Sequence, residues 1–309
     1  MDNSKDISTF LEKNFPQHDC ILVGCQADDD IIVHDCCEYN IIALSESHDS
    51  YPTPLYYKIF ETTKRKSKLN FQVQIIPAAI FHDNTFIRYS DYVYFPRKAL
   101  RNTEIDHFRK KHENFRKTFK FEIKKELFDN IYNLSFLSNY LSQEFIDEKM
   151  VSFELKMASL RTLRNYVQLY SGKEHRPSHL KHQINSIIQS QSIKVRERID
   201  NLLEFLGMHK ANVSALERSE KSLRMLSGNL HSPTKNLILK KVNFFKHKSM
   251  YVDGLFLIYN YVADNFQEQE QKTSYQELLK RITDIDSKEK IFLKKEIKLL
   301  IEYNKLLLT

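Results

Sequence analysis

Short apolar runs separated by polar connections fill the first hundred residues, a pattern typical of a small sheet packed with helices. Apolar positions three and four residues apart predict a helix over 4–15. Buried strands are predicted at 20–24, where an apolar run is closed by glycine, and at 38–44. Over 69–77, Leu, Phe, Val and Ile alternate with Asn and Gln, which predicts a strand with one polar face. These elements predict a compact α/β domain.

A further helix is predicted between the second and third strands. The segment 51–68, YPTPLYYKIFETTKRKSK, carries proline near its start, and proline is well tolerated in the first turn of a helix. We therefore expect a helix that begins after Pro54. The chain then runs through helix, strand, turn or helix, strand, helix and strand, which indicates a mixed sheet.

From Asp91 onward the apolar positions recur at three-, four- and seven-residue steps, the period of amphipathic helices. The clearest helices are predicted at 106–145 and at 151–172, and Gly172 ends the second. Three more are predicted around 190–206, 250–266 and 287–308. This half of the chain is predicted to be a helical bundle.

The composition agrees with two domains. A chain of 309 residues suits two units, and a hydrophobic share of 41% can fill two cores. Five glycines and seven prolines are few turn formers, which favours long helices. We expect an α+β fold, with an α/β domain over 1–105 followed by an all-α helical domain over 106–309.

The chain is expected to be cytoplasmic and to have no contact with a membrane. No stretch approaches the roughly 18 apolar residues of a membrane span, and the first residues have no apolar signal core. Four cysteines, Cys20, Cys25, Cys36 and Cys37, lack CxxC spacing. Reduced thiols are therefore preferred over a zinc site.

Charge differs between the two halves of the chain. Residues 1–100 hold 10 of the 47 Lys and Arg and 14 of the 40 Asp and Glu, a net −4. The remainder holds 37 and 26, a net +11. An acidic domain can hold a metal–nucleotide while a basic one binds a polyanion, or the two can simply attract each other. Charge alone leaves both readings open.

The segment ILVGCQADDDIIVHDCCEYNIIAL (21–44) carries the most informative motif. Val23-Gly24-Cys25 ends one strand, twelve residues follow, and Glu38-Tyr39-Asn40 lies on the next strand. This arrangement resembles the DNA polymerase β-like nucleotidyltransferase superfamily. There a hydrophobic residue, Gly and then Gly or Ser precede [DE]-x-[DE] on a strand by some nine to thirteen residues.

The resemblance implies a nucleotide site that uses Mg²⁺. Residues i and i+2 of a strand point the same way, so two carboxylates there can share divalent cations that bridge the phosphates. Gly24 and Cys25 would let backbone amides approach the nucleotide. The catalytic positions would be Glu38, Asn40 and, on the later strand, Gln74.

Two of the three expected carboxylates are replaced in this chain. Asn40 stands at the second position, and the polar face of the later strand offers Gln72 and Gln74. We therefore expect a degenerate nucleotidyltransferase, a pseudoenzyme that keeps nucleotide or partner binding with weak or no transfer.

A rival interpretation is an active enzyme with shifted metal ligands, in which Asp30 or Asp35 joins Glu38. A second alignment places the acidic strand at Asp28 and Asp30. It leaves two residues after Cys25, too few for the intervening turn, so the Glu38 register is preferred.

Two later segments extend the resemblance. The segment 91–104 is similar to the exit from such domains, and 155–187 is similar to the HEPN-like and kanamycin-nucleotidyltransferase-type helical bundles fused behind them. In these bundles a basic-Pro-Ser-His segment starts a helix, as Arg176-Pro177-Ser178-His179 does here. Ser178 is the expected cap of that helix, and His179 is expected to be a packing or surface residue. A ribonuclease is not favoured, because Leu169 and Tyr170 stand where the histidine after Arg164 is needed.

Two basic segments, 109–125 and 235–248, interleave cations with phenylalanine. This pattern suits nucleic-acid binding through phosphate contacts and base stacking. It also suits aromatic side chains that belong to the core and lysines that form a solvated face, the interpretation we prefer. This interpretation places four phenylalanines in the core: Phe115, Phe119, Phe244 and Phe245. Apolar seams on such a bundle would also allow a homodimer.

Overall fold

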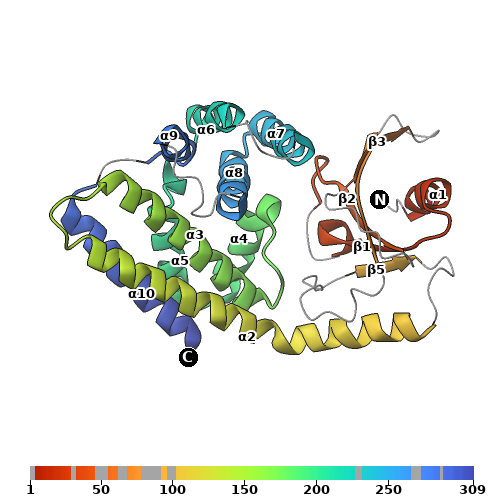
Figure 1. Ribbon diagram of the computed structural model, residues 1–309, viewed down its shortest axis with the longest axis horizontal. Helices are drawn as coiled ribbons and strands as arrows, with labels where there is room; N and C mark the ends of the chain where they lie inside the picture. Colours follow the sequence, from red (N-terminus) through yellow and green to blue (C-terminus); the bar gives the residue numbers. More distant parts are fainter. Residues whose placement is uncertain are drawn as a thin grey trace. The chain divides into compact units, whose positions relative to one another are not determined.

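The computed structural model divides the chain into two compact units, Met1–Phe119 and Lys120–Thr309 (Figure 1). The predicted α+β fold is confirmed, with a small mixed sheet followed by helices. The division falls within one long helix, α2 (Asn102–Tyr140). The structure describes residues 4–28, 33–45, 55–61, 68–77, 92–95, 102–226, 232–265, 273–285 and 288–309.

The first unit holds a five-stranded sheet in the order β3-β4-β2-β1-β5. Strands β2 and β4 are parallel, and the other neighbours are antiparallel. One helix and a short 3₁₀ turn accompany the strands. The elements are α1 (Ser4–Asn14), β1 (Asp19–Val23), η1 (Gly24–Ala27), β2 (Tyr39–Ser45), β3 (Leu55–Glu61), β4 (Lys68–Pro77) and β5 (Tyr92–Phe95).

Helix α1 packs on one face of this sheet. The ring of Phe10 stacks on that of Phe71 with centroids 3.8 Å apart, and Leu11 is fully buried. Alternate residues of three strands join this core: Cys20, Leu22, Tyr39, Ile41, Ala43, Phe71 and Val73. Because strand side chains alternate between faces, the intervening residues lie on the opposite face. That second face carries the polar residues of the predicted site.

Two predictions of local structure in this unit were wrong. The helix expected after Pro54 is the edge strand β3, which pairs with β4. Its sequence, LYYKIFE, is rich in Tyr, Ile and Phe, residues that favour strands, and the preceding proline was misleading. Tyr92–Phe95, placed within the helical half of the pattern, is the short strand β5 beside β1.

The helices beyond Lys120 confirm the predicted bundle (Figure 1). The five predicted segments correspond to α2, α3 (Glu148–Ser171), α5 (Ile193–Phe205), α8 (Tyr251–Asn265) and α10 (Lys290–Leu308), and α4 (Leu180–Ser190) is the helix expected after the Pro-Ser-His segment. Gly172 ends α3 as predicted, in a left-handed conformation with its N–H bonded to the Gln168 carbonyl. Three further helices were not predicted: α6 (Val213–Met225), α7 (Ser232–His247) and α9 (Thr273–Ile282).

A buried polar network joins α2, α3 and α10. The Asn130 amide nitrogen donates to Thr162 Oγ1 at 2.9 Å and to Asn304 Oδ1 at 3.1 Å. Asn304 Nδ2 in turn donates to Thr162 Oγ1 at 2.9 Å. Because buried amides are costly unless hydrogen-bonded, this network fixes the register of the three helices.

Among the described helices, none combines the length and the apolar character that crossing a bilayer requires.

Candidate functional site in the sheet unit

The predicted motif lies where β1 ends and β2 begins. Gly24 follows β1 with φ +82°, a left-handed conformation that glycine adopts without strain. A Cβ added to Gly24 would stand 3.0 Å from Asn40 Nδ2. The structure therefore brings together two predicted site residues, and the absence of a side chain at Gly24 makes the close approach of Asn40 feasible.

The neighbouring strand β4 contributes two more amides. Gln72 is level with Asn40 in the parallel β2–β4 register, while Gln74 is level with Ile42. Gln74 is thus two residues farther along, roughly 6.6 Å at the usual strand rise. The sequence assigned the third position to Gln74. Gln72 is the amide level with Asn40, and no sequence signal gives the register between parallel strands.

Glu38 is the predicted carboxylate of this group. It stands immediately before β2, and its residue is 8% exposed. The structure describes two other acidic candidates: Asp28, a buried residue just after η1, and Asp35, which is exposed. Asp30, the proposed replacement ligand, lies outside the described residues.

These residues do not fit a two-magnesium centre. Mg²⁺ in such centres is bound through carboxylates, and here neutral amides take two of three positions. Within the described part of the sheet unit, no three carboxylate, imidazole or thiol groups come close enough to share one ion. This end of the sheet can instead offer hydrogen-bond donors and acceptors without a large local charge.

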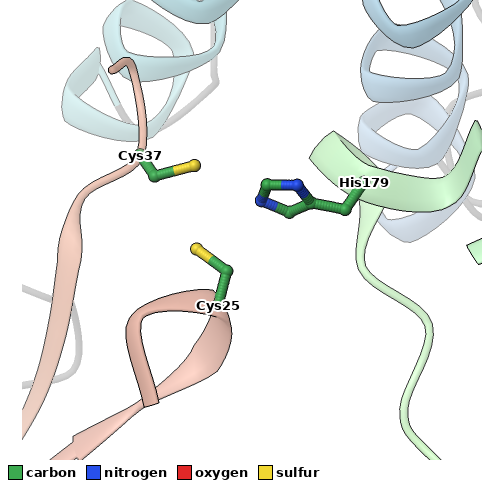
Figure 2. A group of neighbouring side chains, drawn as sticks. All are labelled: Cys25, Cys37 and His179. Atoms are coloured by element: carbon green, nitrogen blue, oxygen red, sulfur yellow. The ribbon is translucent and has the colours of Figure 1, made fainter. Parts of the chain in front are cut away.

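The cysteines separate into two environments. Cys20 belongs to the core under α1, and its thiol donates to the His18 carbonyl at 3.6 Å. Cys25 and Cys37 form a second buried cluster, with sulfur atoms within 4.8 Å of each other (Figure 2). All four are free thiols. Cys20 therefore lies apart from the pair formed by Cys25 and Cys37.

Residues carried over to the helical unit have structural partners

Arg176 and His179 belong to the turn that leads into α4. Both residues are buried, and the His179 N–H donates to the Arg176 carbonyl at 2.8 Å. Gln183 stabilises the same turn, because its Oε1 accepts a hydrogen bond from the Arg176 N–H at 2.9 Å. His179, labelled in Figure 2, is therefore a buried residue of η3 (Pro177–His179), in line with the packing role expected for it.

Ser178 does not cap the following helix, contrary to the prediction. The residue preceding α4 is His179, and it makes no side-chain capping bond. Ser178 Oγ instead accepts from the Lys241 ammonium at 3.4 Å. The one-turn 3₁₀ helix η3 takes up the Pro-Ser-His segment, which moves the start of α4 beyond the serine.

Arg164, the first residue of the incomplete ribonuclease motif, ties α3 to α8. Its Nη1 atom lies 2.8 Å from Asp264 Oδ1, and its other nitrogens donate to the side chain and carbonyl of Asn260. These contacts give the arginine a structural role.

The second basic segment agrees with the preferred interpretation in part, because Lys241, expected on a solvated face, is buried. Phe245 is fully buried, and the ring of Phe244 contacts it at a centroid distance of 5.7 Å. In the first segment, Phe119 is half-buried and the side chain of Phe115 lies outside the description. Phe121, by contrast, is 73% exposed, which the preferred reading of that segment did not anticipate.

A pocket that the sequence did not indicate lies within the bundle. It has an empty volume of about 600 Å³, part of it open to solvent, and Lys156, Lys210 and Lys288 line it. The Lys156 ammonium donates to the carbonyls of Thr283 and Asp284 and lies 5.2 Å from the centroid of the Tyr259 ring. Lys156 therefore neutralises the carbonyl end of α9. The signal for this pocket that the sequence offered was Lys156, a lysine at a core position of the apolar pattern of α3.

Comparisons of this chain with protein-family models, with curated proteins and with solved structures gave no match.

Proposed function

We propose that this chain is a nucleotidyltransferase-fold protein that has lost metal-dependent transfer and binds a nucleotide through neutral amides. The observation that carries the proposal is the position of Asn40, directly against Gly24 and level with Gln72. In the superfamily that the motif resembles, the corresponding positions are expected to hold carboxylates that bind Mg²⁺.

The sheet supports this proposal through its strand arrangement. Strands β1 and β2 are antiparallel neighbours, so the glycine turn after β1 returns to the start of β2. That geometry brings Gly24 beside the Glu38-x-Asn40 pattern across a separation of about a dozen residues. Replacing Asp by Asn keeps the size of the side chain, exchanges one acceptor oxygen for an NH₂ donor, and removes the charge that a cation requires.

The rival interpretations gain less support. An active transferase with shifted ligands depends on Asp30, which lies outside the described residues, or on Asp35. A nucleic-acid-binding bundle needs accessible aromatic side chains among the lysines of 235–248, where Phe245 is buried.

Calorimetric titration of ATP and GTP into the full chain, with and without Mg²⁺, tests the proposal. We expect binding that changes less than about threefold with Mg²⁺, because one carboxylate holds the ion weakly. Gly24→Val should weaken binding at least tenfold, since the new side chain would fill the space beside Asn40. Absence of nucleotide binding, or robust Mg²⁺-dependent nucleotide transfer, would overturn the proposal.

Restoring the missing charges sharpens the test. The double variant Asn40→Asp, Gln72→Glu places three carboxylates at this end of the sheet, and we expect it to bind Mn²⁺ where the wild type does not. The matched control is Asn133→Asp, on an exposed position of α2. Equal Mn²⁺ binding by the control and the double variant would show that the three positions do not converge.

A further inference from the structure

Four large aromatic side chains lie exposed along one face of α2. Phe121, Phe128, Tyr132 and Phe136 are 73%, 62%, 74% and 68% exposed. We call these four residues the aromatic stripe. Monomeric proteins rarely leave a continuous apolar surface of this kind uncovered, so the stripe marks an interaction surface.

The stripe is opposite the face that α2 buries in the bundle. At 100° per residue, its members fall within about 80° of one another around the helix axis. The core residues Ile123, Leu127 and Leu134 lie on the other side, at about 200–240° from Phe121. The stripe is therefore additional to the apolar face that the bundle requires.

The surrounding charges argue against a nucleic acid as the occupant. From Lys120 to Tyr140, α2 carries Lys and Asp or Glu in equal number, with no net charge. Phosphate backbones are bound by clusters of positive charge, which this part of the helix lacks. The charged residues in question are Lys120, Lys124, Lys125, Glu122, Glu126 and Asp129.

The two outer residues of the stripe are placed symmetrically, with Phe128 next to the midpoint between them. Phe121 and Phe136 stand equally far from the midpoint between Phe128 and Asp129, and so do Lys125 and Tyr132. If two copies of α2 run antiparallel across this midpoint, Phe121 of one copy faces Phe136 of the other. Each Lys125 then faces a tyrosine ring, an arrangement that gains cation–π energy.

We propose that the aromatic stripe of α2 is the interface through which two copies of this chain form an antiparallel dimer. A symmetric pair uses the same patch twice, and the equal distance of Phe121 and Phe136 from the midpoint is compatible with that condition. The exposed area is sufficient. With about 200 Å² for each aromatic side chain, the stripe offers about 550 Å² per copy and about 1,100 Å² per pair, above the roughly 1,000 Å² that a specific interface needs.

Sedimentation velocity of the full chain from 1 to 100 μM tests the dimer. We expect the wild type to be dimeric, and Phe128→Glu, Tyr132→Glu to be monomeric through a loss of affinity of at least about 100-fold. The matched control is Ile193→Glu, Met225→Glu, at apolar positions of α5 and α6 that are 71% and 60% exposed. The control should remain dimeric. Circular dichroism verifies that each variant is folded, which the high exposure of the four positions predicts.

A second pair of variants tests the antiparallel register. Phe121→Glu, Phe136→Lys places opposite charges against each other across an antiparallel pair and should retain the dimer. Phe121→Glu, Phe136→Glu places like charges together and should dissociate it.

A wild type that is monomeric at 100 μM would overturn the dimer, and a dimer that survives Phe128→Glu, Tyr132→Glu would overturn its assignment to α2. Equal behaviour of the two charge variants would overturn the register. None of these outcomes depends on nucleotide binding by the sheet unit.

Discussion

The two units of this chain use buried and half-buried polar side chains in different ways. In the helical unit such groups find partners on other helices, as Asn130, Thr162 and Asn304 do. In the sheet unit, Asn40, Gln72 and Gln74 gather on one face of adjacent strands. Within the described residues, the side chain of Asn40 makes no hydrogen bond to the protein. Polar groups that bond to each other specify an architecture, whereas polar groups that remain available at one end of a sheet provide a place for a ligand.

The largest effect is expected from removing a member of the polar network of the bundle. Asn304→Leu should lower the free energy of unfolding by about 2–3 kcal/mol, because it removes two buried hydrogen bonds, from Asn130 Nδ2 to Asn304 Oδ1 and from Asn304 Nδ2 to Thr162 Oγ1. Denaturant unfolding followed by helical circular dichroism measures the change. The matched control is Asn133→Leu on the exposed side of α2, expected to stay within about 0.5 kcal/mol. A loss below about 1 kcal/mol for Asn304→Leu would mean that apolar packing, and not the network, holds the helices in register.

A smaller effect is expected from pH, through His175. Burial, aided by the nearby Arg164 charge, lowers the pKa of this imidazole to about 3. The folded protein therefore keeps His175 neutral while the unfolded chain takes up a proton below its ordinary pKa of 6.5. Stability contributed by this residue is complete above pH 6.5 and falls as the pH drops toward 3, by at most about 1.4 kcal/mol per pH unit.

Denaturant unfolding at pH 7, 5.5 and 4.5 checks the His175 dependence. His175→Gln should flatten the profile between pH 6.5 and 4.5, whereas the same substitution at the exposed His209 should leave its slope unchanged. Identical slopes for the wild type and His175→Gln would show that other groups dominate the acid response.

The smallest effect concerns the sheet unit. Gly24→Ala should cost about 1–2 kcal/mol, because φ +82° is unfavourable for alanine and its Cβ meets the Asn40 amide. Asn40→Ala should cost less than about 1 kcal/mol, since that amide has no hydrogen bond to lose among the residues that the structure describes. Tryptic cleavage of native protein, as a function of denaturant, reports on the sheet unit. A larger loss for Asn40→Ala than for Gly24→Ala would make Asn40 a structural residue and weaken the contrast between the units.

Strong local patterns made most of the fold predictable. The strict alternation in β4 and the three- and four-residue spacing in α3 depend on neighbours along the chain, so they are visible in the sequence. Strand β3 was mistaken for a helix because its state is decided by pairing with β4, a partner encountered later in the chain. Helix α6 was missed because it is short and mostly polar, although its start carries a local signal, the cap Asn212, which accepts a bond from the Ala215 N–H.

The candidate site was predictable in part. A glycine after an apolar run indicated the turn at Gly24, and the contact with Asn40 agrees with the expected grouping. Gln72 lies level with Asn40 because of the parallel register of β2 and β4, and no local sequence pattern encodes that register. The exposed Phe121 escaped detection for a related reason. A periodic helix shows that it has an apolar face, but not whether a second apolar face faces solvent.

The polar network can be completed only late in the synthesis of the chain. Asn304 follows Asn130 by 174 residues. At about 5–20 residues per second, a ribosome adds it roughly 10 to 30 s later. During this interval α2 and α3 can meet, but the Asn130 and Thr162 side chains must rely on water for the contacts that Asn304 later makes. Completion of the bundle therefore waits for α10, and the nascent chain has to be kept from misfolding until that helix emerges.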